Sequence, residues 1–178
     1  MPEAIRRLAL AEAADYRALM LEAHASTPEA FTSSLAERQA LSLSWWQARL
    51  SPGTDAGECV YGAFHDQALV GVSGLRFESR ERTRHKATLF GMFVQPGARG
   101  KGIGQALVMA VLRQAQQSAG ILLVQLTVTD SNQSALRLYE RCGFLRYGVE
   151  PLAVKCGDGY LTKLHLWRGV EGSVPTHR

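Results

Sequence analysis

The sequence predicts a single domain of the mixed α/β class, built around one sheet. Its 178 residues are 46% hydrophobic and 20% charged, which is ordinary for a chain with one globular core. Strand-like and helix-like runs alternate along the chain, and no internal repeat or low-complexity linker divides them. We therefore expect one domain over residues 1–168, followed by a polar, mobile tail over residues 169–178.

The first part of the chain predicts a short strand and two helices. The strand covers residues 5–8, and a helix follows over residues 11–24, because its apolar side chains recur at three- and four-residue spacing. Pro28 ends this helix. The second helix contains the adjacent Trp45 and Trp46.

Three antiparallel strands come next. Residues 59–65 and 68–79 have strand-like composition and are separated by the two turn residues Asp66 and Gln67. The third strand covers residues 88–94, and Gly91 inside it predicts a bulge.

The remaining elements alternate between helix and strand. In order they are a helix over residues 105–119, an apolar strand over 122–129, a helix from Asn132, and closing strands over 144–149 and 159–166.

A glycine-rich loop separates the strand at residues 88–94 from the helix that follows. It consists of Arg99, Gly100, Lys101, Gly102, Ile103 and Gly104. Glycine lets the backbone approach a bulky anion, and the unpaired N–H groups of the next helix add the positive end of its dipole. The loop is not a P-loop, because Lys101 precedes Gly102 and no hydroxyl residue follows Gly104. It is not a dinucleotide fingerprint either, because position 124 is Val where an acidic residue is required. The sequence predicts a phosphate cradle here, and an ordinary glycine-rich turn is the alternative.

Two motifs together resemble the GNAT superfamily of acyl-CoA N-acyltransferases. Arg99, Gly102 and Gly104 match R-x-x-G-x-G, and residues 132–144 are similar to N-x-x-A-x-x-x-Y-x-x-x-G-F. The resemblance covers residues 88–150. It implies a mostly antiparallel sheet flanked by helices, in which the strand before the cradle splays from its neighbour and opens a slot for coenzyme A.

The resemblance also implies how the cofactor is held. The cradle binds the pyrophosphate through backbone N–H groups, and the side chains of Arg99 and Lys101 add positive charge. Backbone groups of Met92, Phe93 and Val94 pair with pantetheine and hold the thioester oxygen.

The implied activity is transfer of an acetyl group from acetyl-CoA to a primary amine of a small molecule, amino acid or peptide, by direct attack and without a metal. Asn132 and Tyr139 lie on one helix face by their spacing. By resemblance, Asn132 binds the pantetheine arm and Tyr139 donates a proton to the departing thiolate. The alternative is a non-catalytic acyl-CoA-binding or regulatory module of the same fold.

The sequence does not identify the general base that takes the proton of the amine. Residues 88–94 contain no ionisable side chain, which favours the non-catalytic alternative, whereas the retained tyrosine favours an enzyme. Glu78 and His85 flank this strand, and water can also take the proton. Glu29 and Glu37 could approach from the acceptor side.

The acceptor pocket is expected between residues 26–50 and 150–160. Its candidate wall residues, each of which is equally explained as core, are Phe31, Trp45, Trp46 and Tyr160.

Composition argues against other classes of protein. The net charge of +4 is modest, and Glu81 interrupts the basic stretch at residues 80–86, so nucleic-acid binding is disfavoured. The longest apolar run, residues 106–112, is far below the ~20 residues that cross a bilayer. The cysteines Cys59, Cys142 and Cys156 lack C-x-x-C spacing, which indicates neither a disulfide framework nor a zinc site. We expect a cytoplasmic monomer or homodimer.

Overall fold

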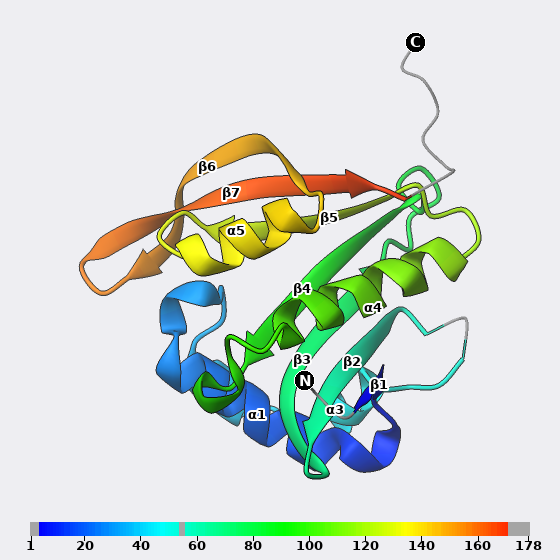
Figure 1. Ribbon diagram of the computed structural model, residues 1–178. Coiled ribbons are helices and arrows are strands. Elements are labelled where there is room, and N and C mark those ends of the chain that lie inside the picture. Colours follow the sequence, from blue (N-terminus) through cyan, green and yellow to red (C-terminus); the bar gives the residue numbers. More distant parts are fainter. Residues whose placement is uncertain (1–3, 54–55, 171–178) are drawn as a thin grey trace.

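A seven-stranded sheet forms the centre of the computed structural model, which describes residues 4–53 and 56–170 (Figure 1). The strands are β1 Ala4–Arg7, β2 Glu58–His65, β3 Ala68–Phe77, β4 Lys86–Val94, β5 Leu123–Thr129, β6 Leu145–Cys156 and β7 Gly159–Gly169. Their order across the sheet is β1-β2-β3-β4-β5-β7-β6. Within the described ranges β4 and β5 pair in parallel and all other neighbours are antiparallel, which confirms the predicted fold class.

Helices cover both faces of the sheet. They are α1 Ala13–Ser26, α2 Leu35–Gln39, α3 Leu43–Ala48, α4 Ile103–Gln117 and α5 Gln133–Arg141, with 3-10 turns η1 Leu10–Glu12, η2 Pro28–Ala30 and η3 Pro96–Ala98. Val60 of β2 belongs to the core formed with α1 and α3, whereas Cys59, its neighbour, belongs to the core formed with α4 and α5. Because side chains alternate along a strand, the two cores lie on opposite faces of the sheet.

The feature of the sheet that creates a site is the separation of β4 from β5. These strands pair only from Lys86 to Thr88 of β4, opposite Leu123 to Gln125 of β5. Beyond that point β4 continues to Val94 and β5 to Thr129 without pairing to each other, and Figure 1 shows the two strands diverging. The splayed strands implied by the family resemblance are therefore present.

The bulge predicted at Gly91 is also present. Ser73 of β3 faces both Gly91 and Met92 of β4 where the register shifts. Gly91 has a φ of 59°, which glycine adopts without strain. Farther back along the chain, Asp66 and Gln67 both have positive φ, of 47° and 63°, as a tight hairpin turn between β2 and β3 requires.

Three segments differ from their sequence-based expectations, and the first is the region after α1, where the sequence predicts one helix and the structure has α2 and α3. The helix break at Pro28 is followed by the single 3-10 turn η2 and then by α2, which begins at a capping box between Ser34 and Glu37. The segment over residues 150–160 lies mainly within β6 and β7 rather than in a loop, because the edge strand β6 pairs with β7 as far as Cys156 opposite Gly159.

Gly169 and Val170, which were expected in the tail, belong to the folded domain. Gly169 is the last residue of β7, and Val170 is buried and donates its N–H to the Leu122 carbonyl oxygen at 2.8 Å. Residues 171–178 lie outside the described part of the chain.

Candidate active site

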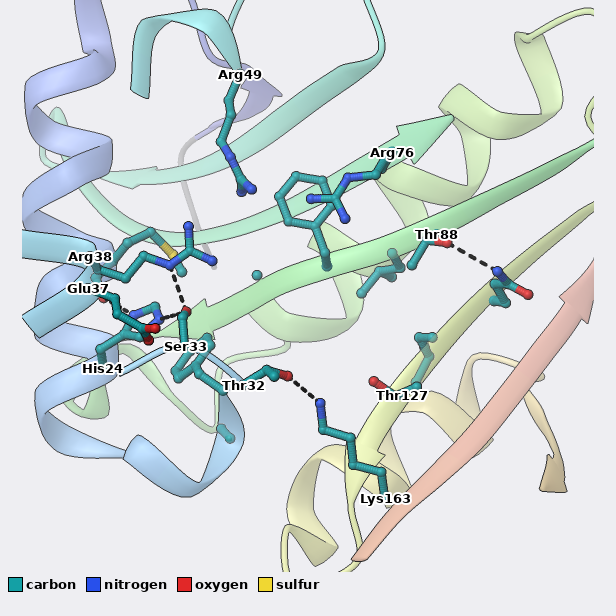
Figure 2. A pocket seen from close by; sticks show the side chains of 18 of the residues that line it. His24, Thr32, Ser33, Glu37, Arg38, Arg49, Arg76, Thr88, Thr127 and Lys163 are labelled. Atoms are coloured by element: carbon teal, nitrogen blue, oxygen red, sulfur yellow. Dashed lines mark hydrogen bonds between the residues drawn. The ribbon is translucent and has the colours of Figure 1, made fainter. Parts of the chain in front are cut away.

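Two cavities lie beside the splayed strands. The first, which we call the cradle cavity, has a volume of about 820 Å³ and is lined by the glycine-rich loop, the end of β4 and the start of α5. The second, the arginine cavity, has a volume of about 700 Å³ and is lined by residues of α1, η2, α2, α3, β3, β4, β5, β6 and β7 and of the loops beside them, including Arg38, Arg49 and Arg76. Figure 2 shows the side chains of the arginine cavity.

The cradle is formed by the start of α4. Gly100 and Gly102 have φ values of 77° and 76°, and Gly102 is the N-cap of the helix. The first intrahelical bond runs from the Ala106 N–H to the Gly102 carbonyl oxygen at 3.0 Å. The N–H groups of the first turn therefore have no partner within the helix and point toward the loop, where an anion would accept them.

Gly104 serves packing in the cradle. A Cβ atom at this position would lie 3.0 Å from Met92 Cε and 3.1 Å from Leu138 Cδ2, so glycine lets α4 approach both β4 and α5. At Gly100 and Gly102, by contrast, an added Cβ would meet nothing within 4 Å. The loop surface at these two positions is open.

The charged residues of the loop have different positions. Arg99 Nε donates to the Val94 carbonyl oxygen at 2.9 Å and ties the loop to the end of β4. Lys101 is exposed and does not belong to the cavity wall. Arg141, at the end of α5, does line the cradle cavity and was not anticipated from the motifs.

Asn132 lines the cradle cavity, as expected of a cofactor-binding residue. It is also the N-cap of α5, because its Oδ1 accepts the Ala135 N–H at 3.2 Å. Its side-chain amide nitrogen makes no hydrogen bond within the described residues. The two roles are compatible, since capping uses the carbonyl oxygen alone.

Tyr139 is held in the core rather than in a cavity wall. Its ring packs edge-on against Phe144 with centroids 5.9 Å apart, and it lines neither cavity. Burial, with a smaller contribution from the Cys142 thiol, raises the pKa of Tyr139 well above its ordinary value. The phenol is therefore protonated at neutral pH. Within the described residues its hydroxyl makes no hydrogen bond.

The two cavities meet at the bulge of β4. Gly91 lines the arginine cavity, Met92 lines the cradle cavity, and Ala30 of η2 lines both. Thr129 at the end of β5 anchors η2, because its Oγ1 donates to the Glu29 carbonyl oxygen at 2.7 Å. Met92, Phe93 and Val94 all line the cradle cavity, so the backbone positions implied by the resemblance lie beside the junction.

The arginine cavity contains a histidine that the sequence gave no reason to single out. His24 Nδ1 lies 2.7 Å from the Met20 carbonyl oxygen and therefore carries the ring proton. Its Nε2 then accepts from Ser33 Oγ at 3.2 Å, and that oxygen accepts from Arg38 Nε at 2.7 Å. Burial lowers the pKa of His24, only partly offset by the bond to Met20. His24 is thus a neutral ring with its lone pair already engaged.

A second histidine, His165 of β7, also lines this cavity. Its Nε2 lies 2.8 Å from Glu150 Oε2, and its ring contacts Tyr147 edge-on at 5.8 Å. β6 and β7 bring His165 and Glu150 together across an antiparallel pair. Alternation along these strands is the only sequence signal that could have suggested the pair.

The acidic and basic candidates named from the sequence fall in different places. Glu78 and His85 belong to the connection between β3 and β4 and line neither cavity. Glu29 lines the cradle cavity and Glu37 the arginine cavity. The Glu37 carboxylate accepts the Ser34 N–H at 2.7 Å, and this bond lowers its pKa.

The aromatic candidates also divide. Phe31 and Trp46 line the arginine cavity, as expected of acceptor-pocket residues. Trp45 stands behind the wall, packed edge-on against Trp46 at 5.1 Å. Tyr160 is 57% exposed and is not part of the cavity.

Comparison with known proteins identifies the family to which this chain belongs. Residues 16–144 match the model of the Acetyltransferase (GNAT) family. That match covers more than half of the chain, so the chain belongs to this family. The resemblance inferred from the two motifs is confirmed.

Curated relatives include the mycothiol acetyltransferase of Salinispora tropica, 29% identical over 152 residues that make up 84% of this chain and 47% of that protein. The streptothricin acetyltransferase of Escherichia coli is 30% identical over 102 residues, 57% of this chain and 56% of that protein. The chain thus spans about half the length of these relatives.

Solved structures share the fold. A GNAT-family acetyltransferase from Streptococcus pneumoniae superposes with a TM-score of 0.81 at 22% identity, covering 94% of this chain and 98% of that one. A phosphinothricin acetyltransferase from Sinorhizobium meliloti, solved in complex with acetyl-CoA, has a TM-score of 0.80 at 20% identity, covering 98% and 97%.

Two further observations concern the described ranges only. No helix in residues 4–53 and 56–170 is long and apolar enough to cross a membrane. The same ranges contain no group of three or more His, Cys, Asp or Glu side chains placed to hold a metal ion.

Proposed function

We propose that this protein transfers the acetyl group of acetyl-CoA to a primary amine by direct attack. The observation that carries the proposal is the meeting of the two cavities at the bulge of β4, between Gly91 and Met92. Coenzyme A occupies the cradle cavity, and the acceptor occupies the arginine cavity. An amine nitrogen and a thioester carbonyl can then approach each other from opposite sides of one opening.

The cofactor contacts follow from the cradle geometry. Unpaired N–H groups at the start of α4 bind the pyrophosphate, and Arg99 and Arg141 add positive charge. The Val94 carbonyl oxygen already accepts from Arg99, which makes Met92 and Phe93 the better candidates for pairing with pantetheine. Asn132 contributes its side-chain amide nitrogen.

Transfer requires two proton movements. The amine nitrogen forms a bond to the carbonyl carbon, the carbon–sulfur bond breaks, and the thiolate of coenzyme A takes up a proton. Tyr139 lines neither cavity, and we keep it as the candidate donor because it matches the tyrosine of the family motif, its phenol is protonated and its hydroxyl has no hydrogen-bond partner within the described residues. Since a free thiol already has a pKa of about 8.5, the benefit is mainly a placed hydrogen bond.

The attacking amine must lose a proton, and His165 is the candidate acceptor. The Glu150 carboxylate beside Nε2 stabilises the imidazolium that would form. His24 is less suited, because Ser33 occupies its lone pair and burial lowers its pKa. Glu78 and His85 lie outside both cavities, so we do not assign them this step.

Thiol release from acetyl-CoA tests the proposal. The purified chain is incubated with acetyl-CoA and a panel of amines, amino acids and peptides, and products are checked by mass spectrometry for one added acetyl group. We expect thiol release that depends on the acceptor. Tight binding of acetyl-CoA with no acceptor-dependent release across the panel would instead identify a non-catalytic acyl-CoA-binding module.

A further inference from the structure

The arginine cavity holds more positive charge than its own carboxylates neutralise. We propose that the acceptor is an amine that also carries a carboxylate, and that Arg38 binds this carboxylate. The inference rests on the proposed acetyl transfer and names the chemical class of the acceptor. An amino acid or a peptide with a nearby carboxylate fits, whereas a polycationic amine does not.

Arg38 is positioned for a ligand rather than for a protein partner. Its Nε donates to Ser33 Oγ at 2.7 Å, and its guanidinium carbon lies 5.0 Å from the centroid of the Trp45 ring. These contacts orient the side chain. The two terminal nitrogens have no hydrogen-bond or carboxylate partner in the described part of the chain. A guanidinium held in this way presents a planar pair of donors, which matches a carboxylate.

The neighbouring arginines add to the excess of charge. Arg49 and Arg76 share one carboxylate, because Glu58 Oε2 lies 3.3 Å from Arg49 Nε and Glu58 Oε1 lies 2.6 Å from Arg76 Nε. Both guanidinium groups also lie over the Phe90 ring, at 4.8 Å and 4.9 Å from its centroid. Figure 2 shows the side chains of Arg38, Arg49 and Arg76 extending into the same cavity.

The remaining charged groups of the cavity do not cancel this excess. Glu37 is exposed and bonded to the Ser34 N–H, and Glu150 is bonded to His165. Lys163 is a fourth cation in the wall, with its Nζ 2.5 Å from Thr32 Oγ1. Burial lowers the pKa of both Arg38 and Lys163, and this effect outweighs the opposing influence of Glu37 on Arg38 and of Glu150 on Lys163. A bound carboxylate would supply the missing negative charge.

Matched acceptors test the proposal. Each free amino acid, ω-amino acid and dipeptide of a panel is paired with its own C-terminal amide, and spermidine represents polycationic amines. We expect the acids to exceed their amides in kcat/KM by about 10- to 100-fold, the effect of one lost charge-assisted contact. Spermidine should be the poorest acceptor. Equal values for acids and amides, or a preference for spermidine, would overturn the inference.

Variants assign the effect to Arg38. Arg38→Gln should raise KM for the acid about 10- to 100-fold, leave KM for acetyl-CoA unchanged and abolish the preference for acid over amide. Arg84→Gln, an exposed arginine outside both cavities, is the matched control and should change none of these values. If Arg38→Gln does not fold, Arg76→Gln tests the same cluster of arginines, because the Arg76 side chain is 44% exposed and less important for folding. It should raise KM for the acid and reduce the preference for acid over amide, both by a smaller factor than Arg38→Gln.

The outcomes separate this inference from the proposed function. Two results contradict the carboxylate site and leave acetyl transfer unaffected. One is equal kcat/KM for acids and their amides, and the other is an Arg38→Gln variant that loses the same factor in kcat/KM for acids and for amides. Absence of thiol release with every amine, while acetyl-CoA binds, contradicts acetyl transfer itself and the carboxylate inference with it.

Discussion

Replacing Gly102 with valine separates the cradle's role in binding from its role in folding. Gly102 has a φ of 76° and lies in the wall of the cradle cavity, where an added Cβ meets no protein atom within 4 Å. The new side chain would therefore project into the space proposed for the pyrophosphate. We expect Gly102→Val to fold, with lower stability and with weaker binding of coenzyme A.

Both effects can be estimated. The left-handed conformation costs a non-glycine residue about 1–2 kcal/mol, and for a chain of this size that lowers Tm by roughly 2–8 °C. Loss of one or two N–H contacts to a charged phosphate removes roughly 1.5–3 kcal/mol of binding, which weakens the affinity for coenzyme A by about 10- to 150-fold.

Gly120→Val is the matched control. Gly120 has a φ of 80° and equally open surroundings, but it lies beyond the C-terminal end of α4 and lines neither cavity. It should show the same loss in Tm with unchanged affinity. Thermal unfolding and isothermal titration calorimetry with coenzyme A measure the two quantities. If folded Gly102→Val bound coenzyme A as tightly as Gly120→Val, the cradle would be only a turn.

Three further predictions concern single side chains. Tyr139→Phe keeps the ring against Phe144 and removes a hydroxyl that has no hydrogen bond within the described residues, so stability and coenzyme A affinity should change little. Turnover should fall roughly 10- to 1,000-fold because the proton donor is lost. Equal turnover in the variant and the parent enzyme would assign Tyr139 to packing alone. His165→Gln should lower kcat/KM for every acceptor, whereas His85→Gln should leave kcat/KM unchanged. Equal kcat/KM in His165→Gln and the parent enzyme would point to deprotonation of the amine in solvent or through ordered water. Burial lowers the pKa of His24 in the folded state, so the unfolded chain binds the extra proton more readily, and stability should fall as pH drops below the ordinary histidine value of about 6.5. Urea unfolding from pH 7.5 to 5 measures how the free energy of unfolding changes with pH. This change should be smaller for His24→Gln than for the parent protein, and an equal change would contradict a neutral buried ring.

The local features of this protein follow from its sequence. Gly100 and Gly102 adopt the positive φ values of the cradle. Asp66 and Gln67 form the expected tight turn, and Gly91 lies at the bulge. Each of these depends on residues close together in the chain, whose backbone preferences act before any packing. The fold class follows from the order of the helices and strands, and the family from the two motifs at residues 99–104 and 132–144.

The tertiary structure decided which side chains share a cavity. Arg38, Arg76 and Lys163 come from α2, β3 and β7 and converge only because β4 and β5 separate beyond Thr88. The folded loop also leaves Lys101 outside the cradle cavity. Convergence of this kind depends on strand order, register and splay, which arise from contacts between segments far apart in the sequence. No short motif encodes such contacts, so the charge that indicates the acceptor became visible only in the folded chain.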